Sequence, residues 1–135
     1  MNSSTQPGRT VLIVDDEPSV LAYLETLLGD AGYRTLTAAD GSEGLAKAKS
    51  EHPDLITLDI NMPKTSGLRM FRELREDPSL ADIKVVVVTA VTGYADDPEE
   101  FHKFMASRPH LRQPEGFVAK PIDAGSFVKL VSGLA

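Results

Sequence analysis

The chain has 135 residues, of which 20 are acidic and 14 basic, so its formal net charge at pH 7 is −6. This length suits one domain with a sizeable core, and the negative charge argues against a surface dedicated to nucleic acid. The chain contains no cysteine, which excludes disulfide bonds, thiolate metal sites and cysteine nucleophiles. No apolar run is long enough to span a bilayer, and residues 1–8 lack the basic and apolar regions expected of a leader. We expect a cytoplasmic protein without membrane insertion, with a flexible tail over residues 1–8 and one domain over residues 9–135.

Five short segments predict β-strands. Three are continuous apolar runs of strand length, which are typical of strands buried on both faces of a parallel sheet. These runs are residues 11–14 (VLIV), 55–58 (LITL) and 85–88 (VVVV). Residues 34–39 alternate more in character and predict an outer strand, and residues 116–119 (GFVA) predict a fifth strand.

Signals for the start and end of helices lie between these segments. Pro18, followed by leucines at helical spacing, predicts a helix that ends by Gly32. Asp40 and Glu43 form a capping pair for a second helix. Three further helices are predicted to begin near Ser66, Asp97 and Asp123. Alternating strands and helices predict a single α/β domain: a doubly wound, five-stranded parallel sheet with five flanking helices.

Polar residues follow four of the predicted strands at their carboxyl ends, where open parallel sheets bind ligands. These residues are Asp15, Asp16, Asp59, Thr89 and Lys120. Three neighbouring carboxylates repel one another and favour a cation, and an all-oxygen ligand set suits magnesium. With a hydroxyl and an ammonium group beside them, such a site can bring a phosphoryl group to a carboxylate nucleophile. The sequence therefore predicts magnesium-dependent phosphoryl transfer onto a carboxylate.

Four stretches that contain these residues carry a resemblance to a known family: VLIVDDEP, LDINMPKTSG, VVVVTA and FVAKP. In this order they resemble a response-regulator receiver domain, the phosphoacceptor domain of two-component signalling. The resemblance covers nearly all of residues 9–135 and implies a flavodoxin-like fold. It also implies that a sensor histidine kinase or a histidine phosphotransfer protein donates a phosphoryl group from phosphohistidine.

The resemblance assigns the acidic residues individual roles. It implies that Asp59 is the phosphoacceptor and that Asp15 and Asp16 hold Mg²⁺, Asp16 more directly. The ion would also contact Asp59 and the backbone carbonyl of Asn61.

The resemblance assigns further roles near the end of the chain. Thr89 would be the switch hydroxyl that closes onto the phosphoryl group, and Lys120 would contact the same group. Phe117 would be an aromatic residue that turns inward on activation, and Pro121 would follow a cis peptide bond. The family signals through the surface of its fourth helix and fifth strand, here around residues 94–119. The resemblance thus implies a signalling switch that catalyses only its own phosphorylation and dephosphorylation, with an unknown downstream protein and a possible homodimer.

Other interpretations of these residues stay open. Glu17 is better explained as an acid at a helix N-terminus than as a ligand. Thr89 could be an ordinary strand residue, Lys120 a solvated charge, and Phe117 part of the core rather than a dedicated switch. A metal-dependent phosphohydrolase would also use an aspartate at a strand end, although VDDEP lacks the Asp-x-Asp spacing of the dehalogenase-like class. A second alternative is a receiver-like module that binds a protein independently of phosphorylation.

One segment departs from the family pattern. The connection from Thr89 to Lys120 is longer than usual by about two helical turns. The excess falls in FHKFMASRPHLRQPEG, which is basic in an acidic protein. It could form an enlarged partner surface, or it could be a tolerated loop insertion between Arg108 and Pro114.

Overall fold

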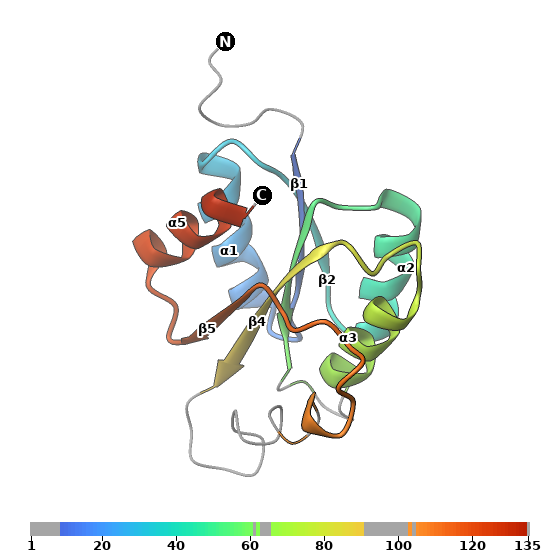
Figure 1. Cartoon of the computed structure of the whole chain (residues 1–135). Coiled ribbons are helices and arrows are strands. Elements are labelled where there is room, and N and C mark those ends of the chain that lie inside the picture. The colour runs from blue at the N-terminus through green and yellow to red at the C-terminus, as the bar shows by residue number, and fades with distance from the viewer. Residues whose placement is uncertain (1–8, 61, 63–65, 91–102, 104, 135) are drawn as a thin grey trace.

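A computed structural model describes residues 9–60, 62, 66–90, 103 and 105–134, and it confirms the predicted parallel sheet (Figure 1). The five strands are all parallel and lie in the order β2-β1-β3-β4-β5. Their bounds are β1 (Thr10–Val14), β2 (Arg34–Ala38), β3 (Leu55–Asp59), β4 (Lys84–Ala90) and β5 (Gly116–Lys120). The strands differ from the predicted segments by one or two residues at their ends. The predicted tail over residues 1–8 lies outside the described residues.

Four helices are present in the described part of the chain: α1 (Pro18–Asp30), α2 (Gly41–Glu51), α3 (Ser66–Glu76) and α5 (Ala124–Leu134). Helices α1 and α5 cover one face of the sheet, and α2 and α3 cover the other (Figure 1). The helix predicted to begin near Asp97 lies outside the described residues, apart from helical positions at 103, 105 and 106. None of the described helices has the length and hydropathy needed to span a membrane.

The helix starts follow the predicted capping signals. The Asp40 side chain accepts a hydrogen bond from the backbone N–H of Glu43 at 2.8 Å, as expected of an N-cap. Asp123 likewise accepts from the N–H of Ser126 at 2.8 Å in front of α5. These bonds satisfy amides that the first helical turn leaves without a partner. The short-range signals in the sequence therefore fix where α2 and α5 begin.

The central strands are buried on both faces, as their continuous apolar runs predicted. Every residue of β1 and β3 is buried. One side of the sheet packs against α2 and α3 through residues that include Leu12, Leu58 and Phe71. The other side packs against α1 and α5 through residues that include Ile13 and Phe127. Each such apolar side chain contributes about 1.5–3 kcal/mol by its burial.

The end of the long connection before β5 belongs to the core. Met105 and Leu111 are buried in the same cluster as Leu74 of α3. This part of the chain is thus held by apolar packing, which argues against a loosely attached insertion between Arg108 and Pro114.

Thr57 in the middle of β3 provides a test of the core. Its side chain is buried, and its hydroxyl has no hydrogen-bond partner among the described residues. Because an unpaired buried hydroxyl costs free energy, we predict that Thr57→Val raises the free energy of unfolding by about 1 kcal/mol. Chemical denaturation measures this difference. Thr35→Val is the control, because the exposed Thr35 hydroxyl donates to Glu25 and its loss should give no gain in stability.

Candidate functional site

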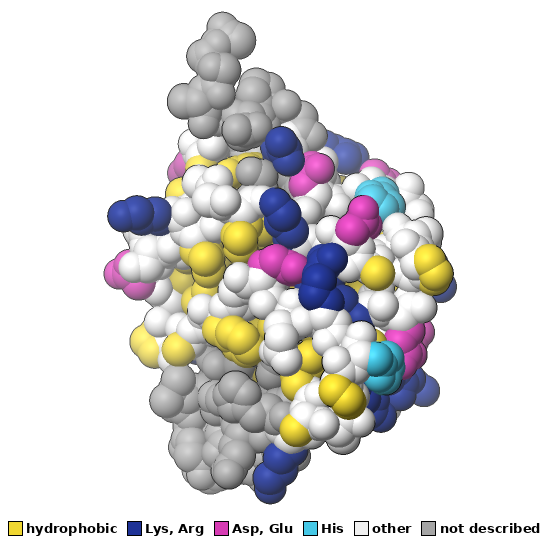
Figure 2. Space-filling model, viewed as in Figure 1, with side chains coloured by type: hydrophobic (Ala, Val, Ile, Leu, Met, Phe, Trp, Pro, Cys, Tyr) yellow, Lys and Arg dark blue, Asp and Glu magenta, His cyan; other side chains and the backbone are white. Residues whose placement is uncertain are grey.

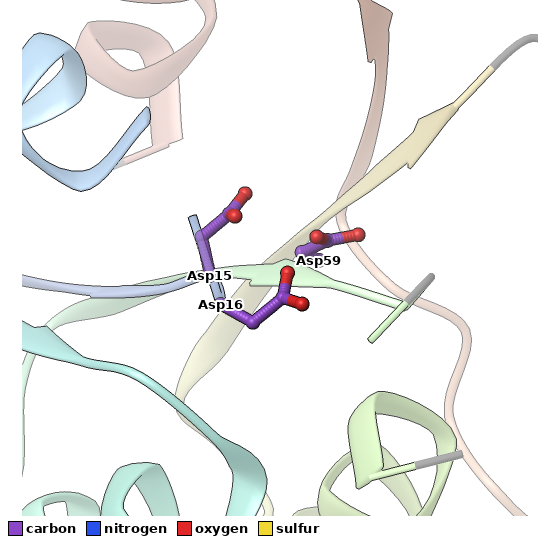
Figure 3. Close-up of side chains that lie close together, drawn as sticks. All are labelled: Asp15, Asp16 and Asp59. Carbon is purple, nitrogen blue, oxygen red and sulfur yellow. The ribbon is translucent and has the colours of Figure 1, made fainter. Parts of the chain in front are cut away.

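Asp15, Asp16 and Asp59 come together at the carboxyl end of the sheet, as predicted (Figure 3). Asp59 is the last residue of β3, and the other two residues directly follow β1, the neighbouring strand. One carboxylate oxygen from each residue lies within 4.8 Å of the others. β2 lies beyond β1 and β4 lies beyond β3, so the site sits where the direction of winding reverses, the usual place for ligands in such sheets.

The three carboxylates differ in burial. Asp15 and Asp59 are 1% and 2% exposed, whereas Asp16 is exposed. The backbone N–H of Glu17 donates to Oδ1 of Asp15 at 2.9 Å. Burying a carboxylate is costly unless charged or hydrogen-bonding groups compensate it. The site therefore requires a cation close to the two buried aspartates.

Lys120 supplies that positive charge from the last position of β5. Its Nζ lies 3.1 Å from Oδ2 of Asp15 and 3.3 Å from Oδ2 of Asp59. Burial lowers the pKa of Lys120, but the carboxylates of Asp59 and Asp15 outweigh this effect, so the pKa lies above its ordinary value. The side chain is thus an ammonium ion at neutral pH, and the interpretation of Lys120 as a solvated surface charge is wrong.

Sequence reasoning missed one contact of this ammonium group. Glu17 is the N-cap residue of α1, as its interpretation as a helix-terminal acid implied, but its side chain makes no capping hydrogen bond. Instead its Oε1 lies 3.5 Å from Nζ of Lys120. The adjacency of Glu17 to the aspartate pair was the only signal in the sequence for this contact.

The donor set fits a hard divalent cation. Three carboxylates and one ammonium leave an excess of negative charge, and all the anionic donors are oxygens. Magnesium prefers such ligands and keeps several waters, for which the exposed Asp16 leaves an open side. Each of the three aspartates could therefore supply one ligand oxygen.

Two of the predicted site residues lie wholly or partly outside the described part of the chain. Asn61 lies outside the described residues, and so does the side chain of Thr89. The backbone of Thr89 lies in β4, between the strand that carries Asp59 and the strand that carries Lys120. Its neighbour Ala90 pairs with Lys120 in the sheet register.

Two expectations concern β5 and the residue after it: the position of Phe117 and the cis peptide bond before Pro121. Phe117 is 48% exposed, so its interpretation as a core residue is wrong. Figure 2 shows hydrophobic side chains over α5 and β5. Phe117 lines a pocket between these elements together with Phe127 and Leu130. The peptide bond between Lys120 and Pro121 is cis, as the resemblance implied.

Gly67 is a further residue on which the site depends. α3 begins close against the end of β3, so a Cβ atom at Gly67 would lie 2.6 Å from Cα of Ile60 and would also collide with the backbone oxygen of Asp59. Only glycine permits this approach without a shift of the backbone. The sequence placed Gly67 near a helix start but gave no indication of this contact.

Fold and site together define a class: a doubly wound domain with an acidic, lysine-bearing site at the carboxyl ends of its strands. The family model described as "Response regulator receiver domain" matches residues 11–132. The chain therefore belongs to the response-regulator receiver family.

Individual relatives agree with this assignment. The polar-differentiation response regulator DivK of Brucella ovis is 31% identical over 125 residues, covering 91% of this chain and 93% of the relative. The probable transcriptional regulator ycf27 of Cyanophora paradoxa is 43% identical over 88 residues, but the match spans only 36% of its length. Among solved structures, the chemotaxis response regulator CheY4 of Vibrio cholerae has a TM-score of 0.77 at 28% identity, covering 94% of this chain and 98% of its own. A putative response regulator from Chloroflexus aurantiacus has a TM-score of 0.79 at 28% identity, with coverage of 96% and 98%.

Substitution of Gly67 tests the contact between α3 and β3. We predict that Gly67→Ala lowers the free energy of unfolding by about 1–3 kcal/mol, because the backbone of residues 59 and 60 must move. Gly29→Ala in α1 is the matched control: nothing lies within 4 Å of its Cβ position, so about 0.5–1 kcal/mol of stabilisation is expected from helix propensity. Equal effects of the two substitutions on denaturation midpoints would contradict the proposed contact.

Substitution of Asp16 tests the donor set. Asp16→Ala should weaken Mg²⁺ binding by about a hundredfold, since losing even an outer-shell partner commonly costs tenfold or more. Titration calorimetry measures the affinity. Glu17→Gln removes a neighbouring acid that is not part of the cluster, and it should have a clearly smaller effect. Unchanged affinity in Asp16→Ala would remove this residue from the set of ligands.

Proposed function

We propose that the protein is a phosphoacceptor switch of a two-component system or phosphorelay, which takes a phosphoryl group from phosphohistidine onto Asp59. The observation that carries the proposal is the buried Asp59 carboxylate beside Asp15, with Lys120 in contact with both. Membership of the receiver family adds to this support. A sensor histidine kinase or a histidine phosphotransfer protein is the donor class.

The reaction follows from the chemistry of these groups. An Asp59 carboxylate oxygen attacks phosphorus, the bond between phosphorus and the donor imidazole nitrogen breaks, and an acyl phosphate forms. Lys120 stays near Asp59 and offers its N–H groups to the new phosphoryl oxygens. A bound Mg²⁺, held by Asp15, Asp16 and Asp59, would neutralise charge on the phosphoryl group. Attack by water on the same phosphorus returns the carboxylate and releases inorganic phosphate.

The output is proposed to pass through the end of the sheet that carries Thr89 and β5. Phosphorylation places new negative charge beside these elements, and the exposed ring of Phe117 lies on the strand that ends at Lys120. A change in the position of this ring would alter the surface between β5 and α5, which is lined by apolar residues. A downstream protein or a second copy of the chain would recognise that surface.

Intact mass spectrometry tests the switch chemistry. Phosphoramidate is a suitable donor because it transfers phosphorus from nitrogen, as phosphohistidine does. We predict that the native protein gains one phosphoryl group only in the presence of Mg²⁺, and that Asp59→Asn gains none, because it lacks the nucleophilic carboxylate.

The other outcomes separate the alternatives. A folded protein that gains no phosphoryl group from an active donor would support the phosphorylation-independent binding module. Continuous turnover of small phosphoesters would instead support a phosphohydrolase. Circular dichroism of each sample verifies that Asp59→Asn remains folded.

A further inference from the structure

A buried arginine lies at the opposite end of the sheet from the acidic site. The side chain of Arg75 in α3 is 1% exposed, and its guanidinium lies 5.2 Å from the centre of the Phe71 ring. It donates hydrogen bonds to five acceptors: the backbone oxygens of Ala81, Ile83, Arg112 and Gln113, and Oε1 of Glu115. A guanidinium has five N–H groups, so every one of them can be used here.

Glu115 connects this arginine to the amino end of β5. It lies 2.9 Å from Arg75, and the same Oε1 accepts a hydrogen bond from the N–H of Val85 at 2.7 Å. Its own backbone N–H donates to the oxygen of Val85 at 2.9 Å. Burial opposes the ionisation of Glu115, but these hydrogen bonds and Arg75 outweigh it and hold its pKa below the ordinary value. Glu115 is therefore charged at neutral pH and attached to both α3 and β4.

Apart from these contacts, the side chains of β5 do little to fix its register against β4. Among the described strands β5 lies at the edge of the sheet, beside β4, and all five of its residues are exposed or half-buried. A strand whose faces are weakly buried is prone to slip along its partner. A slip of one residue would turn Lys120 to the other face of the sheet, away from Asp15 and Asp59.

We infer that Arg75 and Glu115 form a positioning pair that fixes β5 against β4 and so holds Lys120 in contact with Asp15 and Asp59. Arg75 touches none of the reacting groups and acts through the strand that begins after Glu115 and ends at Lys120. The effect on phosphoryl transfer rests on the function proposed above, whereas the effect on the position of Lys120 does not.

The exposed arginines nearby do not share this arrangement. Arg112 pairs with the other Glu115 oxygen at 3.0 Å, but its side chain is about half exposed. Arg69 pairs with Glu73 on the surface of α3 at 3.7 Å, and its side chain is 73% exposed. Because exposed ion pairs contribute little, Arg69→Ala is a suitable control for the loss of a charge from α3.

The test measures Lys120 in the unphosphorylated protein. Its ¹⁵N-labelled ammonium signal, assigned by its absence in Lys120→Ala, reports contact with the aspartates. Arg75→Met should shift this signal toward that of a solvated lysine. Glu115→Gln keeps an oxygen acceptor for Val85 and should move the signal less than Glu115→Ala, which is a second route to the same result if Arg75→Met does not fold.

A stability control separates positioning from general destabilisation. Leu28→Ala removes a buried side chain from the α1 face of the core, far along the chain from β5, and it should leave the Lys120 signal unchanged. An unchanged Lys120 signal in both folded Arg75→Met and Glu115→Ala would overturn the inference, as would an equal shift in Leu28→Ala.

Phosphorylation kinetics extend the test. At saturating Mg²⁺, Arg75→Met should slow phosphorylation by phosphoramidate about tenfold or more, as small misplacements of catalytic groups do. In a Lys120→Ala background the same substitution should cause no further loss, because Arg75 acts through Lys120. An additive loss would contradict this route. If the native protein is not phosphorylated at all, the proposed function fails while the NMR result still decides the positioning of Lys120.

Discussion

The site depends on the burial of two like charges, those of Asp15 and Asp59, at the carboxyl edge of the core. Neither carboxylate could stay in this place without a nearby positive charge, and Lys120 supplies it at 3.1 and 3.3 Å. Lys120 comes from an edge strand, whereas the aspartates come from strands buried on both faces. The two halves of the site are thus held with different rigidity. The core fixes the positions of the aspartates, whereas the position of the ammonium group depends on the contacts that hold β5 in the sheet.

Because the position of Lys120 depends on β5, the buried pair of Arg75 and Glu115 at the other end of the sheet affects the site. An apolar side chain at position 75 could fill the same space, but the carbonyl oxygens around it would then lose their donors. A guanidinium satisfies several carbonyls at once and has one preferred geometry, so it specifies how α3, β4 and the chain before β5 meet. The long connection therefore ends in a fixed structure. The connection between β4 and β5 can be unusually long without displacing Lys120, because Glu115 holds the chain against α3 and β4 just before β5 begins.

The sequence predicted most of the fold because the strongest signals are local or come from simple periodicity. The continuous apolar runs identified β1, β3 and β4 because these strands are buried on both faces, and parallel topology then brought Asp15, Asp16 and Asp59 together. The contacts that it missed join different secondary-structure elements. Gly67 against Asp59 and Arg75 against Glu115 depend on where α3 comes to lie, which no local pattern specifies. The alternative interpretation of Phe117 as a core residue was wrong because an aromatic residue in a strand suggests a core position, and an edge strand does not provide one.

The charges of the site also indicate why a divalent cation belongs to the proposed reaction. In the resting arrangement Lys120 is shared between Asp15, Asp59 and Glu17, and Asp16 adds a further negative charge nearby. Converting Asp59 to an acyl phosphate adds more negative charge at the same place, and Lys120 cannot balance it while also neutralising Asp15. A cation between Asp15 and Asp16 would release Lys120 from Asp15 and leave it for the phosphoryl oxygens. In the proposed switch this ammonium group would then report on phosphorylation, because its contacts would differ between the two states and β5 would carry that difference to the surface.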